Sequence, residues 1–244
     1  MPALIPNISV DCVIFGFHED TLSVLLTKRV LDDPRSGKLI FSDYTLAGHH
    51  IQEGENPDQA AARVLREKTG LKKIHLEQFH TFGETDRLDK EKDWLWVHMR
   101  FPQVSRHVFS IAYYSLVDDQ KIKPDKKHPD AAWFPVKQLP ALGFDHKRMI
   151  DMAWEHLQHA LRREPVGFDL LPEKFTIAQL QKLYETILDT SFDKRNFRKK
   201  VGQMPYVVPI REKLTGKPHK PAQMYMFSRD IYQRTRTDKQ HFAV

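Results

Sequence analysis

The sequence of 244 residues predicts an α+β protein with two domains, at residues 1–165 and 166–244. Strand-like and helical segments alternate through the first part. Pro165, Gly167 and residues 170–172 then interrupt the helical periodicity, which places the domain boundary near residue 165. In the last part, two amphipathic helical segments are followed by two strand-like segments. That order is typical of a helix-turn-helix with a hairpin wing.

The first domain contains several segments rich in β-branched and aromatic residues, which favour strands. We expect strands at residues 12–17, 22–27, 44–46, 76–82, 94–101, 108–116 and 131–136. One helix should lie between them. Asn56 is a good N-cap, Pro57 suits the first turn and Gly70 suits the residue beyond the end, so residues 57–69 should be helical. A second helix is expected at residues 146–162, where apolar residues recur on one side.

The second domain begins with a capping box, in which Thr176 is followed three residues later by Gln179. An apolar stripe continues from this box and predicts the first helix. In the second helix, Phe197 and Val201 lie four residues apart and should face the core, which turns the basic residues outward. The expected elements are helices at residues 176–188 and 193–201 and strands at residues 206–210 and 223–227.

Charge is divided unevenly along the chain. From residue 173 to 244 there are 15 Lys and Arg against 7 Asp and Glu, a net charge of +8. The residues before 173 carry 23 basic against 25 acidic side chains, a net charge of −2. This asymmetry indicates a polyanion-binding module joined to a nearly neutral domain, with a solvated basic tail as the alternative.

Hydropathy and cysteine content bear on location. No apolar run approaches the length that crosses a bilayer, and the first residues lack the pattern of a signal peptide, so no membrane partner is expected. The single cysteine, Cys12, lies in an apolar strand-like run and cannot form an internal disulfide. A reducing cytoplasm is therefore the expected location.

Residues 48–71 resemble the signature of the Nudix hydrolases, in which a Gly, a Glu, Arg-Glu, a hydrophobic residue, Glu-Glu and a final Gly follow at fixed spacings. The residues that fit this box are Glu55, Arg63, Leu65, Glu67, Gly70 and Leu71. Three positions depart from it: His49 stands for a Gly, Val64 for the first helix Glu and Lys68 for the last Glu.

These departures affect the metal chemistry. Helix positions 64, 67 and 68 lie within one turn, and we expect them to share a face. Three carboxylates there would bind a divalent cation that clamps a pyrophosphate. With Val64 and Lys68 in place, only Glu67 is left, so we expect no bound metal, no cofactor, no catalytic residues and no enzymatic activity. An active hydrolase that uses Glu55 and Glu67 is one alternative, and a silent protein-binding scaffold is another.

Both halves together resemble the Nudix-related transcriptional regulators of the NrtR and AraR type. The likeness is carried by the box and by residues 11–17, 110–116, 139–146, 183–185 and 193–198. It implies a Nudix α/β/α sandwich that senses a small molecule, followed by a winged helix-turn-helix that binds a double-stranded DNA operator, usually as a homodimer. The resemblance also implies a role in repression.

The same resemblance bears on the effector. It is ADP-ribose in some members of the family and a sugar such as arabinose in others. Val64 resembles the sugar-responsive branch, which makes a sugar the first expectation and ADP-ribose the second. The stretch 88–103 is longer than the family pattern and lies near the expected pocket.

The candidate effector-binding residues are polar or aromatic side chains in or near the box and the strands around it. They are Arg29, His49, His50, Glu67, Glu84, Arg87, Tyr113, Asp145 and His146. Ordinary surface or core roles are the alternative for most of them. Asp145 and His146 could equally cap the helix that follows.

The candidate DNA-binding residues lie on the basic helix, the wing and the start of the preceding helix. Arg195 and Asn196 are expected at base edges, since Arg pairs with guanine and Asn with adenine. Phosphate contacts are expected from Lys194, Arg198, Lys199, Lys200, Lys217, His219 and Lys220. Thr176 and Gln179 are expected to place backbone amides against a phosphate.

Overall fold

The computed structural model describes residues 3–72, 74–118, 130–214 and 222–236. The chain forms two compact units. The first unit comprises Met1–Gly16 and Ser23–Ala153, and the second comprises Phe17–Leu22 and Trp154–Val244. The units divide inside a helix, whereas the sequence placed the boundary near residue 165. The proline and glycine there follow the end of that helix at Arg163.

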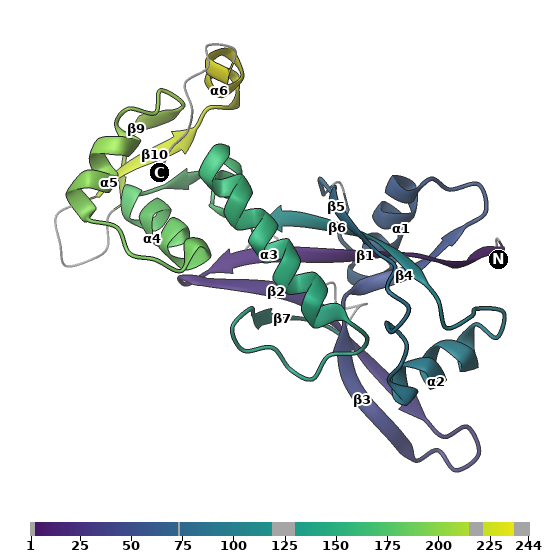
Figure 1. Ribbon diagram of the computed structural model, residues 1–244. Helices are drawn as coiled ribbons and strands as arrows, with labels where there is room; N and C mark the ends of the chain where they lie inside the picture. Colours follow the sequence, from purple (N-terminus) through teal and green to yellow (C-terminus); the bar gives the residue numbers. More distant parts are fainter. Residues whose placement is uncertain (1–2, 73, 119–129, 215–221, 237–244) are drawn as a thin grey trace. The chain divides into compact units, whose positions relative to one another are not determined.

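A mixed seven-stranded sheet forms the body of the first unit (Figure 1). Its strands are β1 (Leu4–His18), β2 (Thr21–Asp32), β3 (Leu39–Thr45), β4 (Ala47–Gln52), β5 (Glu77–Phe82), β6 (Phe109–Val117) and β7 (Ala131–Pro135). The order is β3-β2-β1-β6-β5, with β4 paired to β1 and β7 paired to β2. β1 and β6 run parallel, and β4 runs antiparallel to β1.

The box helix α1 (Pro57–Thr69) has the bounds that its end signals predict. The Asn56 side chain accepts a hydrogen bond from the Gln59 N–H at 2.9 Å, and the Gln59 side chain accepts one from the Asn56 N–H at 3.0 Å. Gly70 ends the helix with φ of 79°, a left-handed conformation that suits glycine. Both ends are therefore fixed by residues next to the helix.

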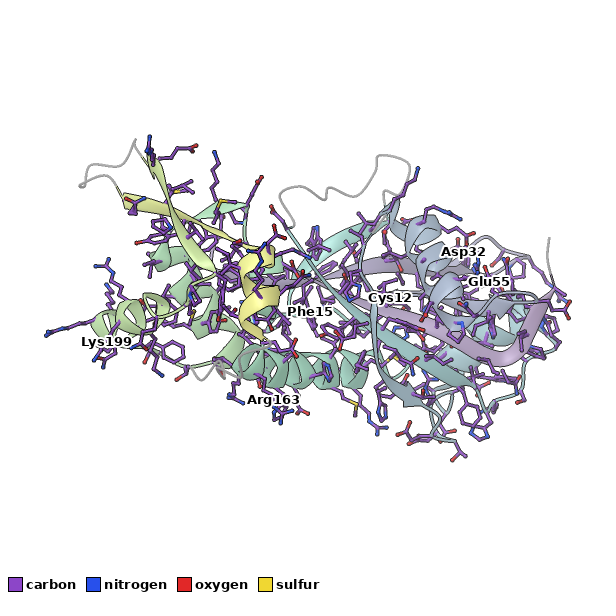
Figure 2. The ribbon with its side chains drawn as sticks, turned by 90° about the horizontal axis from the view of Figure 1, so that it is seen from above. Cys12, Phe15, Asp32, Glu55, Arg163 and Lys199 are labelled. Carbon is purple, nitrogen blue, oxygen red and sulfur yellow. The ribbon has the colours of Figure 1, made fainter. Side chains whose placement is uncertain are left out.

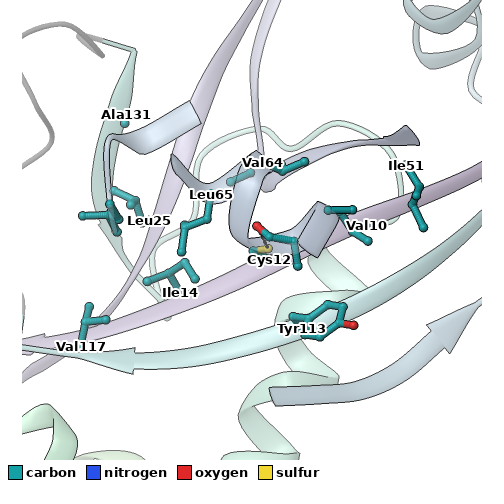
Figure 3. Close-up of a cluster of buried hydrophobic side chains, with 14 residues drawn as sticks. Val10, Cys12, Ile14, Leu25, Ile51, Val64, Leu65, Tyr113, Val117 and Ala131 are labelled. Carbon is teal, nitrogen blue, oxygen red and sulfur yellow. Dashed lines mark hydrogen bonds between the residues drawn. The ribbon is translucent and has the colours of Figure 1, made fainter. Parts of the chain in front are cut away.

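The two faces of β1 contact different helices. Val10, Cys12 and Ile14 are fully buried and share a core cluster with Val64 and Leu65 of α1 (Figure 3). Because side chains alternate along a strand, Asp11, Val13 and Phe15 point to the other face.

The helix α3 (His146–Arg163) begins on that second face, where His146 Nε2 lies 3.4 Å from Asp11 Oδ1. A helix therefore packs on each face of the sheet. This arrangement confirms the predicted Nudix-type sandwich.

Residues 94–101 were predicted as a strand, and this prediction is wrong. Most of them belong to α2 (Glu91–Arg100). Asp93 and Val97 are the buried positions of this helix, and their spacing of four is that of one helical face. Asp93 accepts hydrogen bonds from Arg29 and from the Phe144 N–H. These two partners lie 64 and 51 residues from Asp93 in the sequence. Such tertiary contacts favour the helix at residues 91–100 over the strand that the alternation of large apolar and polar residues predicts.

The second unit contains the predicted winged helix-turn-helix. Its elements are η1 (Val166–Leu170), β8 (Lys174–Phe175), α4 (Ile177–Leu188), α5 (Lys194–Val201), β9 (Val207–Leu214), β10 (Ala222–Phe227) and α6 (Arg229–Arg236). The last three strands form a sheet of order β8-β10-β9. The sequence did not indicate β4, η1, β8 or α6. No helix within the described ranges is long and apolar enough to cross a membrane.

Aromatic rings form the core of the second unit. The rings of Phe168 and Phe227 stack with centroids 4.5 Å apart, and Tyr184 meets Phe197 of α5 at 5.9 Å. The tip of the β1–β2 hairpin also belongs to this unit, and the Thr186 hydroxyl of α4 donates to the Asp20 carbonyl at 3.2 Å.

Candidate functional site

The first unit contains a cavity of about 110 Å³, partly open to solvent, beside the Asp11 face of the sheet. It is lined by Ser9, Asp11, Thr45, Leu46, Gly48, His49, His50, Arg87, Leu88, Val97, Phe101, Val108, Phe144 and His146. An apolar cavity of roughly 150 Å³ holds a benzene ring in another protein. The cavity is somewhat smaller than this, so at most one ring of a ligand fits inside it.

Asp11 is the charged group of the cavity wall. The Ser110 hydroxyl donates to one of its oxygens. His146 Nδ1 accepts the Leu46 N–H at 2.9 Å, so His146 Nε2 carries the hydrogen that faces Asp11. Burial by itself raises the pKa of Asp11, but the hydrogen bond from His146, the charge of Arg87 and the Ser110 hydroxyl outweigh burial and lower it. The cavity therefore presents an ionised carboxylate.

Gly48 makes room for this carboxylate. It lies directly opposite Asp11 in the β1–β4 pair. A Cβ atom at residue 48 would lie 1.8 Å from Asp11 Oδ1, far inside contact distance. A side chain at position 48 would therefore displace Asp11, so Gly48 has a steric role in this wall.

His50 contributes an unused hydrogen-bonding atom. Its side chain is buried, and Nε2 has no hydrogen-bond partner. Burial, with a smaller contribution from His49, lowers the pKa of His50 to about 4, so the ring is neutral at physiological pH. The Phe101 ring lies 4.7 Å from His50 and 5.4 Å from His49. A ligand in the cavity could therefore bind Nε2 without displacing an internal partner.

Arg87 is held firmly at the cavity wall. Its guanidinium makes two hydrogen bonds to Asp145, at 2.8 and 3.0 Å, and a third to the Val108 carbonyl at 3.1 Å. Asp145 is therefore the partner that orients Arg87. Of the predicted effector residues, the structure brings His49, His50, Arg87 and His146 to the cavity and places Asp145 behind them.

Four other predicted effector residues do not line the cavity. Arg29 is buried and pairs with Asp43 and Asp93. The Tyr113 hydroxyl donates to Asp58 at 2.6 Å, and burial raises the pKa of Tyr113.

The remaining two predicted residues, Glu67 and Glu84, form ion pairs at the surface. Glu67 pairs with Arg63 at 3.1 Å, and Glu84 pairs with Arg148 at 2.6 Å. All four side chains thus have structural partners that lie on other turns or elements and that the sequence did not reveal.

Sequence reasoning also missed several lining residues, among them Asp11, Phe101 and Phe144. Asp11 gave a usable signal, because a carboxylate interrupts an otherwise apolar strand and must find partners if buried. Phe101 and Phe144 gave none, since single aromatic residues are ordinarily part of a core.

The box does not present the expected metal-binding face. Val64 is fully buried in the core cluster, so it does not share an exposed face with Glu67 and Lys68. Arg63 binds both remaining carboxylates, with contacts of 2.6 Å to Glu55 and 3.1 Å to Glu67. Within the ranges that the structure describes, no three His, Cys, Asp or Glu side chains are placed to hold a metal ion. The two box carboxylates are thus already paired with an arginine.

The basic helix α5 presents its charges outward. Asp193 caps it by accepting the Asn196 N–H at 2.9 Å. Phe197 and Val201 are buried, as their spacing predicts. The predicted DNA-contacting residues of this helix are all exposed, namely Lys194, Arg195, Asn196, Arg198, Lys199 and Lys200. Figure 2 shows Lys199 projecting away from the ribbon.

The other predicted DNA contacts have different outcomes. Thr176 and Gln179 form the capping box of α4, in which each side chain accepts the other residue's N–H, at 3.2 and 2.8 Å. Their two amides are thus used inside the protein, contrary to the expectation that they contact a phosphate. Lys217, His219 and Lys220 of the wing lie outside the described residues.

Comparison with known proteins is consistent with both units. Residues 6–153 match the NUDIX domain, and residues 167–227 match the NrtR DNA-binding winged helix domain. The chain therefore belongs to the Nudix family and is a Nudix-related transcriptional regulator.

Three relatives illustrate this membership. The "ADPR responsive transcriptional repressor NtrR" of Acinetobacter baylyi is 27% identical over 233 residues, covering 93% of this chain and 84% of that protein. The crystal structure of Shewanella oneidensis NrtR complexed with a 27mer DNA matches with a TM-score of 0.72 and 27% identity, covering 93% and 95% of the two chains. The "ADP-ribose pyrophosphatase" of Methanocaldococcus jannaschii is 28% identical over 154 residues, covering 62% and 76%.

Proposed function

We propose that this regulator is a cytoplasmic, homodimeric repressor whose Nudix domain binds ADP-ribose or a similar nucleoside diphosphate. This binding changes the affinity of its winged helix for operator DNA. The exposed face of α5 carries the DNA-binding part of the proposal. A helix held by Phe197 and Val201 with cations on its outer side suits the major groove and its phosphates.

The effector proposal differs from the first expectation of a sugar. That expectation depended on Val64, but Val64 is a core residue and does not line the cavity. Its identity therefore gives no information about the effector. Support for ADP-ribose comes from the similarity to the ADPR responsive repressor of Acinetobacter baylyi and from a cavity whose wall includes Asp11, Arg87 and three histidines. Arabinose has no such support.

We further propose that the chain does not hydrolyse pyrophosphates. Glu55 and Glu67 are engaged by Arg63, and the donor set lacks a third carboxylate. The resemblance to a Methanocaldococcus pyrophosphatase makes a hydrolase the second candidate. Incubation with ADP-ribose and Mg²⁺ or Mn²⁺ tests this, and turnover that Glu67→Gln abolishes would establish the hydrolase instead.

DNA binding can be tested with a duplex that the protein selects from a random-sequence library. Arg195→Ala should weaken binding by about 1–3 kcal/mol and relax the preference at one base position. A dimer should select a palindrome with half-sites one or two helical turns apart. Equal affinity for the selected duplex and for a scrambled duplex would show that α5 is a basic surface without sequence specificity.

Coupling can be tested in the same system. If ADP-ribose changes the Kd for DNA by some factor, DNA must change the Kd for ADP-ribose by the same factor. Fluorescence anisotropy with labelled duplex, with and without ADP-ribose, measures the first factor, and calorimetry measures the second. The effector proposal fails if ADP-ribose leaves the Kd for DNA unchanged and DNA leaves the Kd for ADP-ribose unchanged.

A further inference from the structure

The chain passes between its two units three times, and each passage lies inside a continuous element. These elements are β1, β2 and α3. Two of the three also line the cavity, β1 with Ser9 and Asp11 and α3 with His146. A molecule bound in the cavity therefore contacts two elements that continue into the second unit.

β1 and α3 contact each other at the cavity wall. His146 is the first residue of α3, and its Nε2 lies 3.4 Å from Asp11 Oδ1, a long distance for a hydrogen bond. The other Asp11 oxygen accepts the Ser110 hydroxyl. A ligand group that donates to Oδ1 therefore competes with His146, and its contacts depend on the position of the first turn of α3 relative to β1.

In the second unit, α3 caps the C-terminal end of α4. Trp154 Nε1 donates to the Ile187 carbonyl at 3.0 Å, and Gln158 Nε2 donates to the same oxygen at 2.8 Å. Ile187 lies in the last turn of α4, where backbone carbonyls have no partner inside the helix. Trp154 and Gln158 are four residues apart and share one face of α3. Two neighbouring side chains of α3 thus hold the end of α4.

The hairpin tip that follows β1 contacts the same turn of α4. Glu19 and Asp20 form this tip, and both have a positive φ, of 46° and 63°, as a tight two-residue turn requires. The Asp20 carbonyl accepts the Thr186 hydroxyl at 3.2 Å. Asp20 also lines a groove together with Lys194 and Arg198 of α5. The tip therefore lies beside the basic helix as well as against α4.

We propose that β1 and α3 together transmit effector binding to the DNA-binding helices, from the Asp11–His146 contact to the last turn of α4. This inference rests on the proposed effector. A ligand shifts a conformational equilibrium only if its contacts differ between the two states, and competition at Asp11 supplies such a difference. Because residues 186 and 187 directly precede the turn that leads to α5, a displacement of this end of α4 moves α5.

Substitutions at the α4 end of the two elements test the proposal, because they change neither the cavity wall nor α5. Thr186→Val removes the hydroxyl that bonds to the tip, and Trp154→Phe with Gln158→Leu removes both donors from α3. Each variant should bind the selected duplex alone and ADP-ribose alone as the wild type does. The factor by which ADP-ribose changes the Kd for DNA is typically about 5–150 in coupled systems. It should fall in each variant and approach one in the triple variant.

Matched controls lie on the same two helices or next to them. Thr190→Val, at an exposed threonine just beyond α4, and Glu155→Gln, at an exposed position of α3, should keep the wild-type factor. Hydrogen exchange of the wild type gives a readout that needs no substitution. ADP-ribose without DNA should change the exchange of the amides of residues 187–190, and unchanged exchange there would overturn the proposal.

The outcomes separate this inference from the proposed function. If ADP-ribose changes the DNA affinity of the triple variant as much as that of the wild type, the signal takes another route and the proposed function stands. Complete loss of the factor in one variant and none in the other would overturn the joint role of β1 and α3. If ADP-ribose does not bind the wild type, or binds without changing its DNA affinity, both the inference and the proposed effector are wrong.

Discussion

At the scale of single residues, the burial of His50 makes the folded chain sensitive to acid. Burial lowers its pKa from 6.5 to about 4 in the folded chain. Between these values the unfolded chain binds a proton that the folded chain does not, so folding stability falls as the pH drops from 6.5 toward 4. At about 1.36 kcal/mol per pKa unit, this loss is at most about 3 kcal/mol.

Urea unfolding at several pH values between 7.5 and 4 checks this effect. His50→Gln should unfold more easily than the wild type at pH 7.5, because it disturbs the packing against Phe101, but the difference should shrink in acid. The exposed His159 provides a control, and His159→Gln should follow the wild type throughout. A difference between His50→Gln and the wild type that does not change with pH would contradict the expectation.

Comparison of Arg29 with Arg87 shows what the sequence could predict at this scale. Both were expected near the effector, and both are buried and paired with carboxylates. Only Arg87 lines the cavity. Their partners Asp93 and Asp145 are 64 and 58 residues distant, so no local pattern distinguishes the two arginines. His49 and His50 were expected near the effector because they lie in the box, and strand β4, which the sequence did not indicate, carries them opposite Val10 and Ser9.

At the scale of elements, the sequence predicted where the helices begin and end better than it predicted which helix face is buried. The bounds of α1, α4 and α5 follow from caps that lie within a few residues of each helix. The exposed side of α1 was misassigned, because Val64 faces the core through contacts with strands that the sequence does not align. For α2, the tertiary partners of Asp93 outweighed the strand-like alternation.

The burial of Val64 predicts that the box cannot be rebuilt residue by residue. Val64→Glu places a carboxylate in an apolar cluster without a partner and should cost about 3–5 kcal/mol of unfolding free energy, the penalty typical of an unpaired buried charge. Lys68→Glu, one turn further along and exposed, should cost much less. Urea titration of both variants gives the comparison, and similar losses would show that the side chain at 64 can reach solvent.

The turn between α4 and α5 is fixed by one hydrogen-bonded group. The Gln181 side chain donates to Glu185 Oε1 at 2.8 Å and to the Phe192 carbonyl at 2.9 Å, and Glu185 Oε1 also accepts the Phe192 N–H at 2.9 Å. Glu185→Ala should free the turn and lower DNA affinity, although no DNA-contacting residue changes. A cost of about 1–3 kcal/mol is expected in unfolding. Unaltered DNA binding in anisotropy measurements would show that α5 needs no such support.

At the scale of the whole molecule, the excess positive charge is confined to the last third of the chain. DNA affinity should therefore fall steeply with salt, and Lys199→Ala should reduce the slope of log K against log salt by about one. Lys72→Ala, in the first unit, should leave the slope unchanged. If the two variants give equal slopes, the phosphate contacts do not come from α5.

The interleaving of the two units limits how such a protein can be divided or recombined. Because the second unit includes Phe17–Leu22 as well as the chain from Trp154 onward, no single cut separates the units. A fragment that starts at Trp154 loses the carbonyl that accepts the Thr186 hydroxyl, and one that ends at Ala153 keeps a hairpin tip without its neighbours. Gene fusion at one junction would therefore transplant an incomplete DNA-binding unit. The DNA-binding unit can be exchanged between regulators only if the tip of the β1–β2 hairpin is exchanged with it.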